Sequence, residues 1–384
     1  MGKITDNLDI KQIIKNYLLK YKKSIIIYLL IIILLILGIQ LIDNNYRFYD
    51  TPIAKITSVE NKFKEERKGD KGEVEKYYTQ IIQAEIKNGE FKDKKIVLSN
   101  IYSSSQIYDD EYVKGDKVFV NISSDKSEEI LKGTITGLKR DKYIAITISI
   151  FFLLLILVAR KRGFIIFISL ILNMIIFIYA LYKYMNGVDL LLMSNILVLT
   201  FTIISMTFTS GFNKKTLAAI ISTLISIEVV MLLFKIVIAV SDGIDYSAFE
   251  YMLNPNDLHK IFMLEIMIGG LGAIMDISIS MASTMSELIE KDNNISRKRL
   301  LSSGRELGYD IMGTMINVLL FTYICGEIPL IILKMKNGFN LINLITLHMP
   351  FELYRFLIGS IGILIAIPIS QLVSVLILKK GSRK

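Results

Sequence analysis

Long apolar stretches separated by short polar segments dominate the hydrophobic pattern of this chain. Eight stretches are each long enough to cross a hydrocarbon core of about 30 Å at about 1.5 Å per residue. They cover residues 24–42, 143–159, 164–182, 190–210, 216–240, 258–285, 310–334 and 352–378. The pattern predicts an α-helical multi-pass membrane protein with about eight transmembrane helices. The first stretch is longer than the core of a signal peptide and no small-residue cleavage site follows it, so we interpret it as an uncleaved anchor.

A different pattern fills residues 43–142. Apolar and polar positions alternate in "IAKITSV" (53–59), "YYTQIIQAEI" (77–86), "KIVLS" (95–99) and "KVFVN" (117–121), which predicts strands. The charged run at 61–76 predicts a loop. Five or six strands are typical of a small β-rich domain, either an OB-like barrel or a sandwich. We expect this domain to brace the first two helices, and a ligand-receiving or partner-docking role is the alternative.

Basic residues flank the apolar stretches on one side. They gather at 1–23, 160–162, 213–215, 296–299 and 379–384, whereas the segment 241–257 has acids and no bases. The positive-inside rule then predicts a cytoplasmic tail (1–23), an anchor helix (24–42), an extracytoplasmic domain (43–142), a seven-helix bundle (143–378) and a second cytoplasmic tail (379–384). These flanks account for the net charge of +9, so no nucleic-acid partner is expected. A hydrophobic content of 52% and a mean hydropathy of +0.49 fit a membrane protein.

The stretch at 258–285 carries acids that a membrane helix rarely accepts. On a helical wheel one narrow face holds Glu265, Gly269, Gly272, Asp276, Ser280, Ser283 and Glu287. The opposite, methionine-rich face is predicted to contact lipid or core. A charged group at mid-membrane costs roughly 2.5–3.5 kcal/mol, so Asp276 has to be protonated, paired or in contact with water. We interpret the acids and serines as a proton or ion pathway and the two glycines as packing positions. A neutral, hydrogen-bonded Asp276 in a tight helix contact is the alternative.

Other helices supply candidate partners for these acids. They are Asn317 and Glu228 at the depth of Asp276, and Lys235 and Glu327 nearer the predicted outer surface. Lys235 is expected to neutralise Glu327 or the outermost acid of the stripe. All of these pairings are inferred from depth alone.

Charged residues also mark the ends of the last two helices. Glu352 and Arg355 have the i,i+3 spacing of a local ion pair. Ser296 is a candidate cap for a short basic helix that precedes the stretch at 310–334. Arg305 and Glu306 follow at the predicted inner mouth, where they either gate the pathway or anchor the helix at the headgroups.

Three segments carry a family resemblance: "GGLGAIMDISISMASTMSEL" (269–288), "GRELGYDIMGTMINVLLFTYICGEIPL" (304–330) and "GSIGILIAIPIS" (359–370). They resemble the YibE/F family of bacterial membrane proteins. The resemblance implies an anchor, an outer β-rich domain and a helical bundle in a bacterial plasma membrane, and it implies little about function. The acidic helix is also similar, in order and orientation, to helices of resistance-nodulation-division exporters and of Sec translocon accessory subunits. This chain departs from them by two extra spans and a smaller outer domain, so the likeness favours a proton-coupled role by analogy only.

These observations predict a transporter or exporter component coupled to protons or cations through the acidic stripe. Its partners would be the lipid bilayer, an unidentified small-molecule or ion substrate, and a membrane protein or a second copy of the chain. A non-transporting scaffold or assembly factor with an extracytoplasmic docking domain is the alternative. No catalytic residue is proposed, because "GAIMD" lacks the Gly-x-Gly-Asp pattern and no Ser-His, His-Glu-x-x-His or P-loop pattern occurs. One cysteine and two distant histidines predict neither disulfides nor a metal site, and no cofactor is expected.

Overall fold

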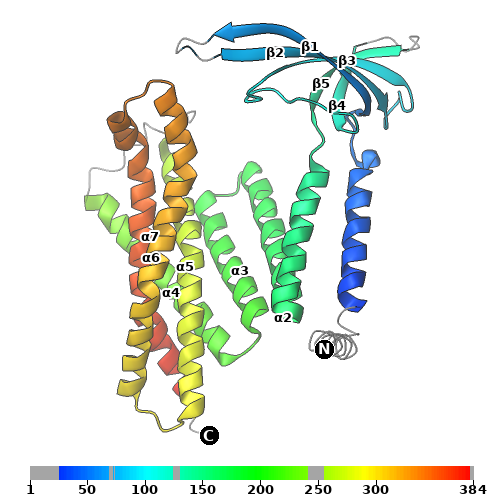
Figure 1. Ribbon diagram of the computed structural model, residues 1–384. Coiled ribbons are helices and arrows are strands. Elements are labelled where there is room, and N and C mark those ends of the chain that lie inside the picture. The colour runs from blue at the N-terminus through cyan, green and yellow to red at the C-terminus, as the bar shows by residue number, and fades with distance from the viewer. Residues whose placement is uncertain (1–25, 69–71, 73, 124–129, 241–254, 381–384) are drawn as a thin grey trace, which may run out of the picture. The chain divides into compact units, whose positions relative to one another are not determined.

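The structure is a computed structural model that describes residues 26–68, 72, 74–123, 130–240 and 255–380 (Figure 1). The expected basic tail at 1–23, most of the tail at 379–384 and most of the acidic segment at 241–257 lie outside the described residues. Backbone contacts divide the chain into two compact units, Met1–Val158 and Ala159–Lys384.

Five strands form a closed barrel in the first unit. They are β1 (Ile53–Lys68), β2 (Val74–Ile86), β3 (Lys95–Ser103), β4 (Lys117–Ile122) and β5 (Ile130–Leu138). Around the barrel the order is β1-β2-β3-β5-β4, with β3 and β5 parallel and every other neighbouring pair antiparallel. Alternating apolar side chains fill the interior, among them Ile82, Leu98 and Leu131, each at most 1% exposed. Of the two predicted arrangements, the barrel is the one that forms.

The strands β1 and β2 extend beyond the barrel as a charged hairpin. The predicted loop at 61–76 is therefore wrong over most of its length. The ladder pairs Phe63 with Tyr78 and Glu66 with Lys76, and β1 is largely exposed along this arm. A strand with water on both faces needs no apolar alternation, so its sequence has no period of two that would mark it.

Two buried lysines tie the barrel to the end of the N-terminal helix, Ile26–Asp43. Lys117 Nζ donates to the carbonyl oxygen of Asp43 at 2.7 Å and lies 2.9 Å from the Asp43 carboxylate. Lys139 Nζ donates to the preceding helical carbonyl at 3.0 Å and lies 3.0 Å from Asp141 Oδ2, at the start of α2. The last carbonyls of a helix lack intrahelical donors and carry partial negative charge, so ammonium groups stabilise them. The barrel is thus bonded to the helix before it and the helix after it.

The helix α2 (Asp141–Met185) contains two helical segments that meet at Arg160. The Arg160 backbone, with φ 51° and ψ −126°, is not helical. A non-glycine residue with positive φ interrupts the regular hydrogen-bond ladder. The predicted stretches at 143–159 and 164–182 lie on the two sides of this break.

In the described residues, the second unit contains the last part of α2 and five further helices. These are α3 (Leu190–Ser210), α4 (Lys214–Val240), α5 (Pro255–Lys291), α6 (Arg297–Lys336) and α7 (Leu341–Lys380). Helix α5 packs against α4 and α7 most extensively, and against α3 and α6 to a lesser degree. Within the described part of the chain, seven helices are long and apolar enough to cross a membrane, with α2 counted once.

Helix ends in this unit are fixed by caps. Asp189 caps α3 by accepting hydrogen bonds from the amides of Leu191 and Leu192, and its carboxylate lies 2.7 Å from Lys260 Nζ on α5. The Lys260 ammonium, followed by these amides, lowers the pKa of Asp189 below its ordinary value. Ser296 caps α6, and its Oγ accepts from the amide of Arg299 at 3.2 Å. The predicted cap is correct, but the short separate helix is wrong, because α6 runs unbroken from residue 297 to residue 336.

Candidate functional site

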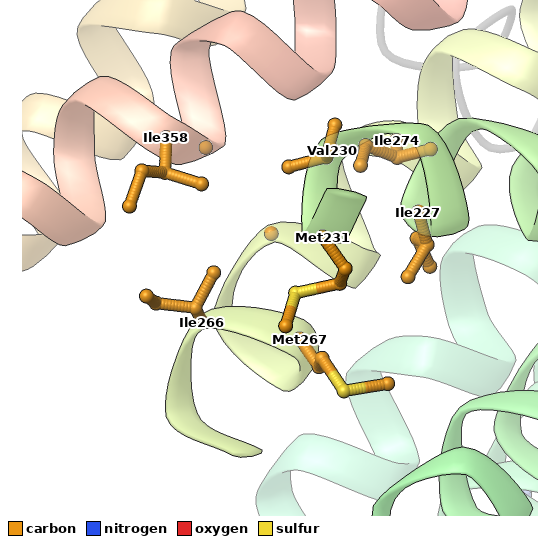
Figure 2. A pocket seen from close by; sticks show the side chains of 9 residues that line it. Ile227, Val230, Met231, Ile266, Met267, Ile274 and Ile358 are labelled. Atoms are coloured by element: carbon orange, nitrogen blue, oxygen red, sulfur yellow. The ribbon is translucent and has the colours of Figure 1, made fainter. Parts of the chain in front are cut away.

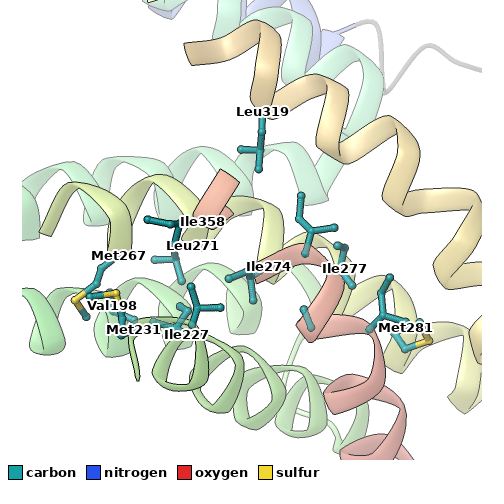
Figure 3. Packing of buried hydrophobic residues seen from close by; sticks show 14 of the residues in the cluster. Val198, Ile227, Met231, Met267, Leu271, Ile274, Ile277, Met281, Leu319 and Ile358 are labelled. Carbon is teal, nitrogen blue, oxygen red and sulfur yellow. The ribbon is translucent and has the colours of Figure 1, made fainter. Parts of the chain in front are cut away.

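The methionine-rich face of α5 is buried in protein. Met263, Met267, Leu271, Ile274 and Met281 are 0–5% exposed and belong to the largest apolar cluster of the second unit. Figure 3 shows Met267, Leu271 and Ile274 among side chains of the neighbouring helices. Of the two environments predicted for this face, lipid or core, the core is therefore the correct one.

A gap of about 10 Å³ remains in this core. It lies between α4, α5 and α7, next to Met231, Ile266 and Ile358 (Figure 2). Its walls are apolar side chains and two glycines, so they offer no side-chain hydrogen-bond partners. A gap of this size and polarity is a packing defect and does not suit a water molecule or a ligand.

The acidic face of α5 points away from the core. Asp276 and Glu287 are exposed, and Ser280 and Ser283 are partly buried. Glu287 lies 2.8 Å from Lys291, one helical turn further on. Within the described residues, no hydrogen bond or ion pair reaches Asp276. The three acids of the stripe thus have different environments, and the described residues do not enclose them in one continuous path.

The third acid, Glu265, is held by an arginine of α7. Arg355 Nη1 lies 2.6 Å from Glu265 Oε1, and Arg355 Nη2 contacts the carboxylate of Glu352. The side chains of Glu352, Arg355 and Glu265 are 7%, 16% and 38% exposed. Two carboxylates therefore share one guanidinium inside the helical unit. With all three groups ionised, one negative charge is left without a counter-ion, which is unfavourable in a medium of low polarity.

Two residues of α6 complete this arrangement. Gly269 follows Glu265 by one turn and lets the Tyr323 hydroxyl approach α5, since a Cβ at position 269 would lie 2.5 Å from that oxygen. Glu327, one turn beyond Tyr323, is within electrostatic range of both Glu265 and Glu352. We call the five side chains Glu265, Tyr323, Glu327, Glu352 and Arg355 the arginine–carboxylate cluster. It joins α5, α6 and α7.

Several predicted pairings are not formed. Lys235 on α4 is exposed, and the cation that meets Glu265 is Arg355, so the pairing with Lys235 is wrong. Glu228 is exposed on α4. Asn317 donates to the Gly313 carbonyl of its own helix at 2.9 Å. Neither Glu228 nor Asn317 meets Asp276 in the part of the chain that the structure describes.

The predicted pairings were inferred from the depth of each residue along the predicted spans, and these depths differ from those in the structure. The span at 352–378 was expected to begin at Glu352, but α7 begins at Leu341. Glu352 is consequently about three turns inside the helix, and Arg355 about four, at 3.6 residues per turn. Glu265 is a similar distance inside α5, which begins at Pro255. The predicted local pair of Glu352 and Arg355 is present, and it also reaches a residue 90 positions away in the sequence.

The packing glycines are mostly not the predicted ones. Among the described residues nothing lies within 4 Å of a Cβ built on Gly272, so the predicted packing of another described helix against Gly272 is wrong. Gly270 instead lies opposite Gly359 of α7, with its Cβ position 3.8 Å from the Gly359 Cα. Gly304 and Gly308 bring α6 against α7, where a Cβ on Gly308 would lie 2.6 Å from Ile367 Cγ2. Arg305 and Glu306 stand between these two glycines and are exposed.

The serine that breaks the apolar side of α5 has a partner on α7. Ser278 is fully buried, and its Oγ accepts a hydrogen bond from Ser370 Oγ at 3.1 Å. Tyr323 and Ser370 were missed from the sequence, because a tyrosine and a serine in apolar stretches carry no pattern of their own. Only the glycine spacing on α5 hinted that another helix approaches there.

Long apolar helices joined to a small β-barrel, with a charged cluster inside the helical unit, define a multi-pass membrane protein. Two family models match this chain: the YibE/F-like protein over residues 147–380 and the YibE/F family N-terminal domain over residues 47–138. The chain belongs to the YibE/F family, as its sequence resemblance predicted. No curated protein and no solved structure matches it.

Proposed function

We propose that this protein is a component of a membrane transporter or exporter coupled to protons or cations through the arginine–carboxylate cluster. The observation that carries the proposal is the sharing of one guanidinium, Arg355, by Glu265 and Glu352. Glu265 belongs to the acidic stripe, so the proposal keeps one acid of the stripe and locates the coupling at the end that Arg355 contacts. Asp276 is not part of the proposed coupling site.

The charge balance of the cluster explains the coupling. Glu265 and Glu352 together carry one charge more than Arg355 neutralises, and Glu327 adds a further negative charge nearby. In a low-dielectric interior the excess is removed by a proton or by a metal cation. When the proton or cation leaves, Arg355 becomes the only counter-ion, and the contacts among α5, α6 and α7 change strength. A proton or cation that binds on one side of a membrane and is released on the other side couples such a change to transport.

The proposed topology has eight crossings, with both termini in the cytoplasm and the barrel outside a bacterial plasma membrane. It counts α2 twice, because the break at Arg160 divides 45 residues, about 67 Å of helix at 1.5 Å per residue. The basic residues at 160–162, next to the break, support a cytoplasmic turn there.

Cysteine labelling tests this topology. The single native Cys325 is first replaced by serine, and then Tyr108→Cys in the barrel or Phe212→Cys between α3 and α4 is introduced; these positions are 94% and 95% exposed. A membrane-impermeant maleimide is expected to label residue 108 in intact cells or spheroplasts and residue 212 only after permeabilisation. The reverse pattern would invert the topology, and labelling of both positions in intact cells would exclude the proposed number of crossings.

Thermal unfolding in detergent tests the coupling site without knowledge of the substrate. A ligand bound only by the folded state stabilises it by RT ln(1 + [L]/Kd). We expect the melting temperature of the wild type to change across pH 5–9 or with added Na⁺ or K⁺. Glu352→Gln is expected to remove that response. Glu287→Gln is the matched control, because Glu287 is an exposed acid on α5 that pairs with Lys291 and lies outside the arginine–carboxylate cluster.

The interpretation of this experiment depends on the charged and titratable side chains around Glu352. They are Arg355 on its own helix, Glu265 on α5, and Glu327 and Tyr323 on α6. A response that persists in Glu352→Gln and disappears in Glu265→Gln places the exchangeable charge on Glu265. An identical melt of wild type and both variants under every condition would overturn the proposal and favour the non-transporting scaffold.

A further inference from the structure

A groove in the second unit opens between α2, α3 and α5. Its volume is about 510 Å³, and apolar side chains make up most of its walls. Pockets for small molecules typically have such volumes and such linings, with a few polar groups that fix orientation. Six residues matter for its chemistry: Asn173 on α2, Ser205 and Thr209 on α3, and Leu271, Gly272 and Met275 on α5.

The polar groups of the groove include an unpaired acceptor. Asn173 Nδ2 donates to Ser205 Oγ at 2.8 Å, and the Thr209 hydroxyl donates to the carbonyl of Ser205 at 2.7 Å. Asn173 Oδ1 is shielded from solvent and has no donor within the described residues. A buried acceptor without a donor is unfavourable, so a bound molecule with an N–H or O–H group would be favoured there.

Gly272 and Asp276 set the α5 side of the groove. Gly272 lines the groove, and no atom of the described residues lies within 4 Å of its Cβ position, so the missing side chain leaves room there. Asp276 follows Gly272 by one helical turn and comes directly after Met275 in the sequence, and both of these neighbours line the groove. It is exposed and has no ion pair within the described residues, although α5 is apolar enough to span a membrane. A carboxylate in that setting attracts a cation.

We propose that the groove binds an amphiphilic organic cation from within the membrane, with its apolar body along α2 and α3 and its cationic head at Asp276. Charge complementarity with Asp276 selects a cation, the unpaired Asn173 oxygen selects a hydrogen-bond donor, and the apolar walls select a hydrophobic body. The inference rests on the proposed transport function, for which it names the substrate class. The arginine–carboxylate cluster and the groove then lie along one helix, since Glu265 and Asp276 are about 16.5 Å apart at 1.5 Å per residue.

Equilibrium binding to the purified full-length chain in zwitterionic nanodiscs tests this assignment. The probe is rhodamine 6G, a fluorescent amphiphilic cation, measured by fluorescence polarisation against empty nanodiscs. Its free acid, which carries an added carboxylate, is the matched probe. We expect saturable binding of rhodamine 6G and binding of the free acid that is weaker by about tenfold or more, as for a lost charge-assisted contact.

Variants assign the binding to the groove. Gly272→Leu fills empty space and is expected to abolish saturable binding, whereas Asp276→Asn is expected to weaken it about tenfold. Gly313→Leu, at an equally open glycine of α6, and Glu228→Gln, at an exposed acid of α4, are expected to bind as the wild type does. Melting curves of all variants show whether the fold is retained.

Three binding results would overturn the proposal. They are the absence of saturable binding, equal binding of the two probes, which indicates a site for any lipid chain, and unchanged binding in a folded Gly272→Leu protein. A change of oligomeric state in Gly272→Leu would instead assign this face to a second copy of the chain and would also refute it. This binding experiment uses no ion gradient and does not measure the pH or cation response of Glu352. A negative binding result therefore does not refute the proposed coupling site. The absence of a pH or cation response would likewise not refute binding in the groove.

Discussion

Replacing Arg355 with leucine is expected to destabilise the helical unit by about 3–5 kcal/mol, the usual consequence of removing one partner of a buried ion pair. The guanidinium is the direct counter-ion of Glu265 and Glu352, and the Glu352 side chain is only 7% exposed. Its removal leaves two carboxylates close together without a cation. Equilibrium unfolding of the purified protein in mixed micelles of increasing SDS content measures the loss.

A second substitution separates this charge effect from lost packing. In Arg355→Leu combined with Glu352→Leu, the buried excess charge is reduced, and stability is expected to recover substantially because an apolar replacement of a buried pair is often neutral. Arg305→Leu, at an exposed arginine of α6, is the matched single control and is expected to change stability by no more than about 0.5 kcal/mol. An Arg355→Leu protein as stable as the control would mean that Arg355 is not the counter-ion of the cluster.

The barrel contains the second position at which a small change is expected to have a large effect. Gly133 on β5 pairs with Leu98 of β3 and with Ile122 of β4. A Cβ at this position would lie 2.4 Å from the carbonyl oxygen of Asn121 and 3.1 Å from Ile96 Cδ1. The first of these contacts is with backbone and cannot be relieved by a side-chain rotation. Gly133→Ala is therefore expected to destabilise the barrel by about 1–3 kcal/mol, as overpacking does.

The same strand provides the control. Gly137 has no atom of the described chain within 4 Å of its Cβ position, so Gly137→Ala is expected to leave stability unchanged or to raise it by up to about 1 kcal/mol. Hydrogen exchange of the full-length protein measures both effects through the protection of the β5 amides. Equal protection of β5 in the two variants would contradict the close approach of β4 and β5 at Gly133.

Alternation of apolar and polar residues identified the strands that bury one face and expose the other. The length of the apolar stretches identified the helices. The strands around Ile82 and Leu98 bury one face and expose the other, so their alternation is visible in the sequence. The apolar helices are visible through their length. The arm of β1 beyond Val59 has water on both sides and therefore carried a charged, aperiodic sequence that suggested a loop.

The candidate site depended on information that a helical wheel does not contain. The wheel separated Asp276 from Met281 correctly, but it could not tell which face meets other helices, because neighbours are set by the packing of distant segments. Glu265 and Arg355 meet across 90 positions of sequence because α5 and α7 begin at similar distances before these residues. The predicted span at 352–378 agrees closely with the apolar span Met349–Lys379, but it did not show that α7 already begins at Leu341.

The most direct test of the arginine–carboxylate cluster is a count of protons. Purified wild type and Glu352→Gln are titrated potentiometrically in the same detergent between pH 9 and pH 5, with Glu287→Gln as the control. We expect the wild type to take up about one proton more than Glu352→Gln in this range, because the excess negative charge of the cluster is neutralised within it. The control is expected to titrate as the wild type does. Titration curves that are identical for wild type and Glu352→Gln would contradict the central claim that this cluster binds and releases a proton.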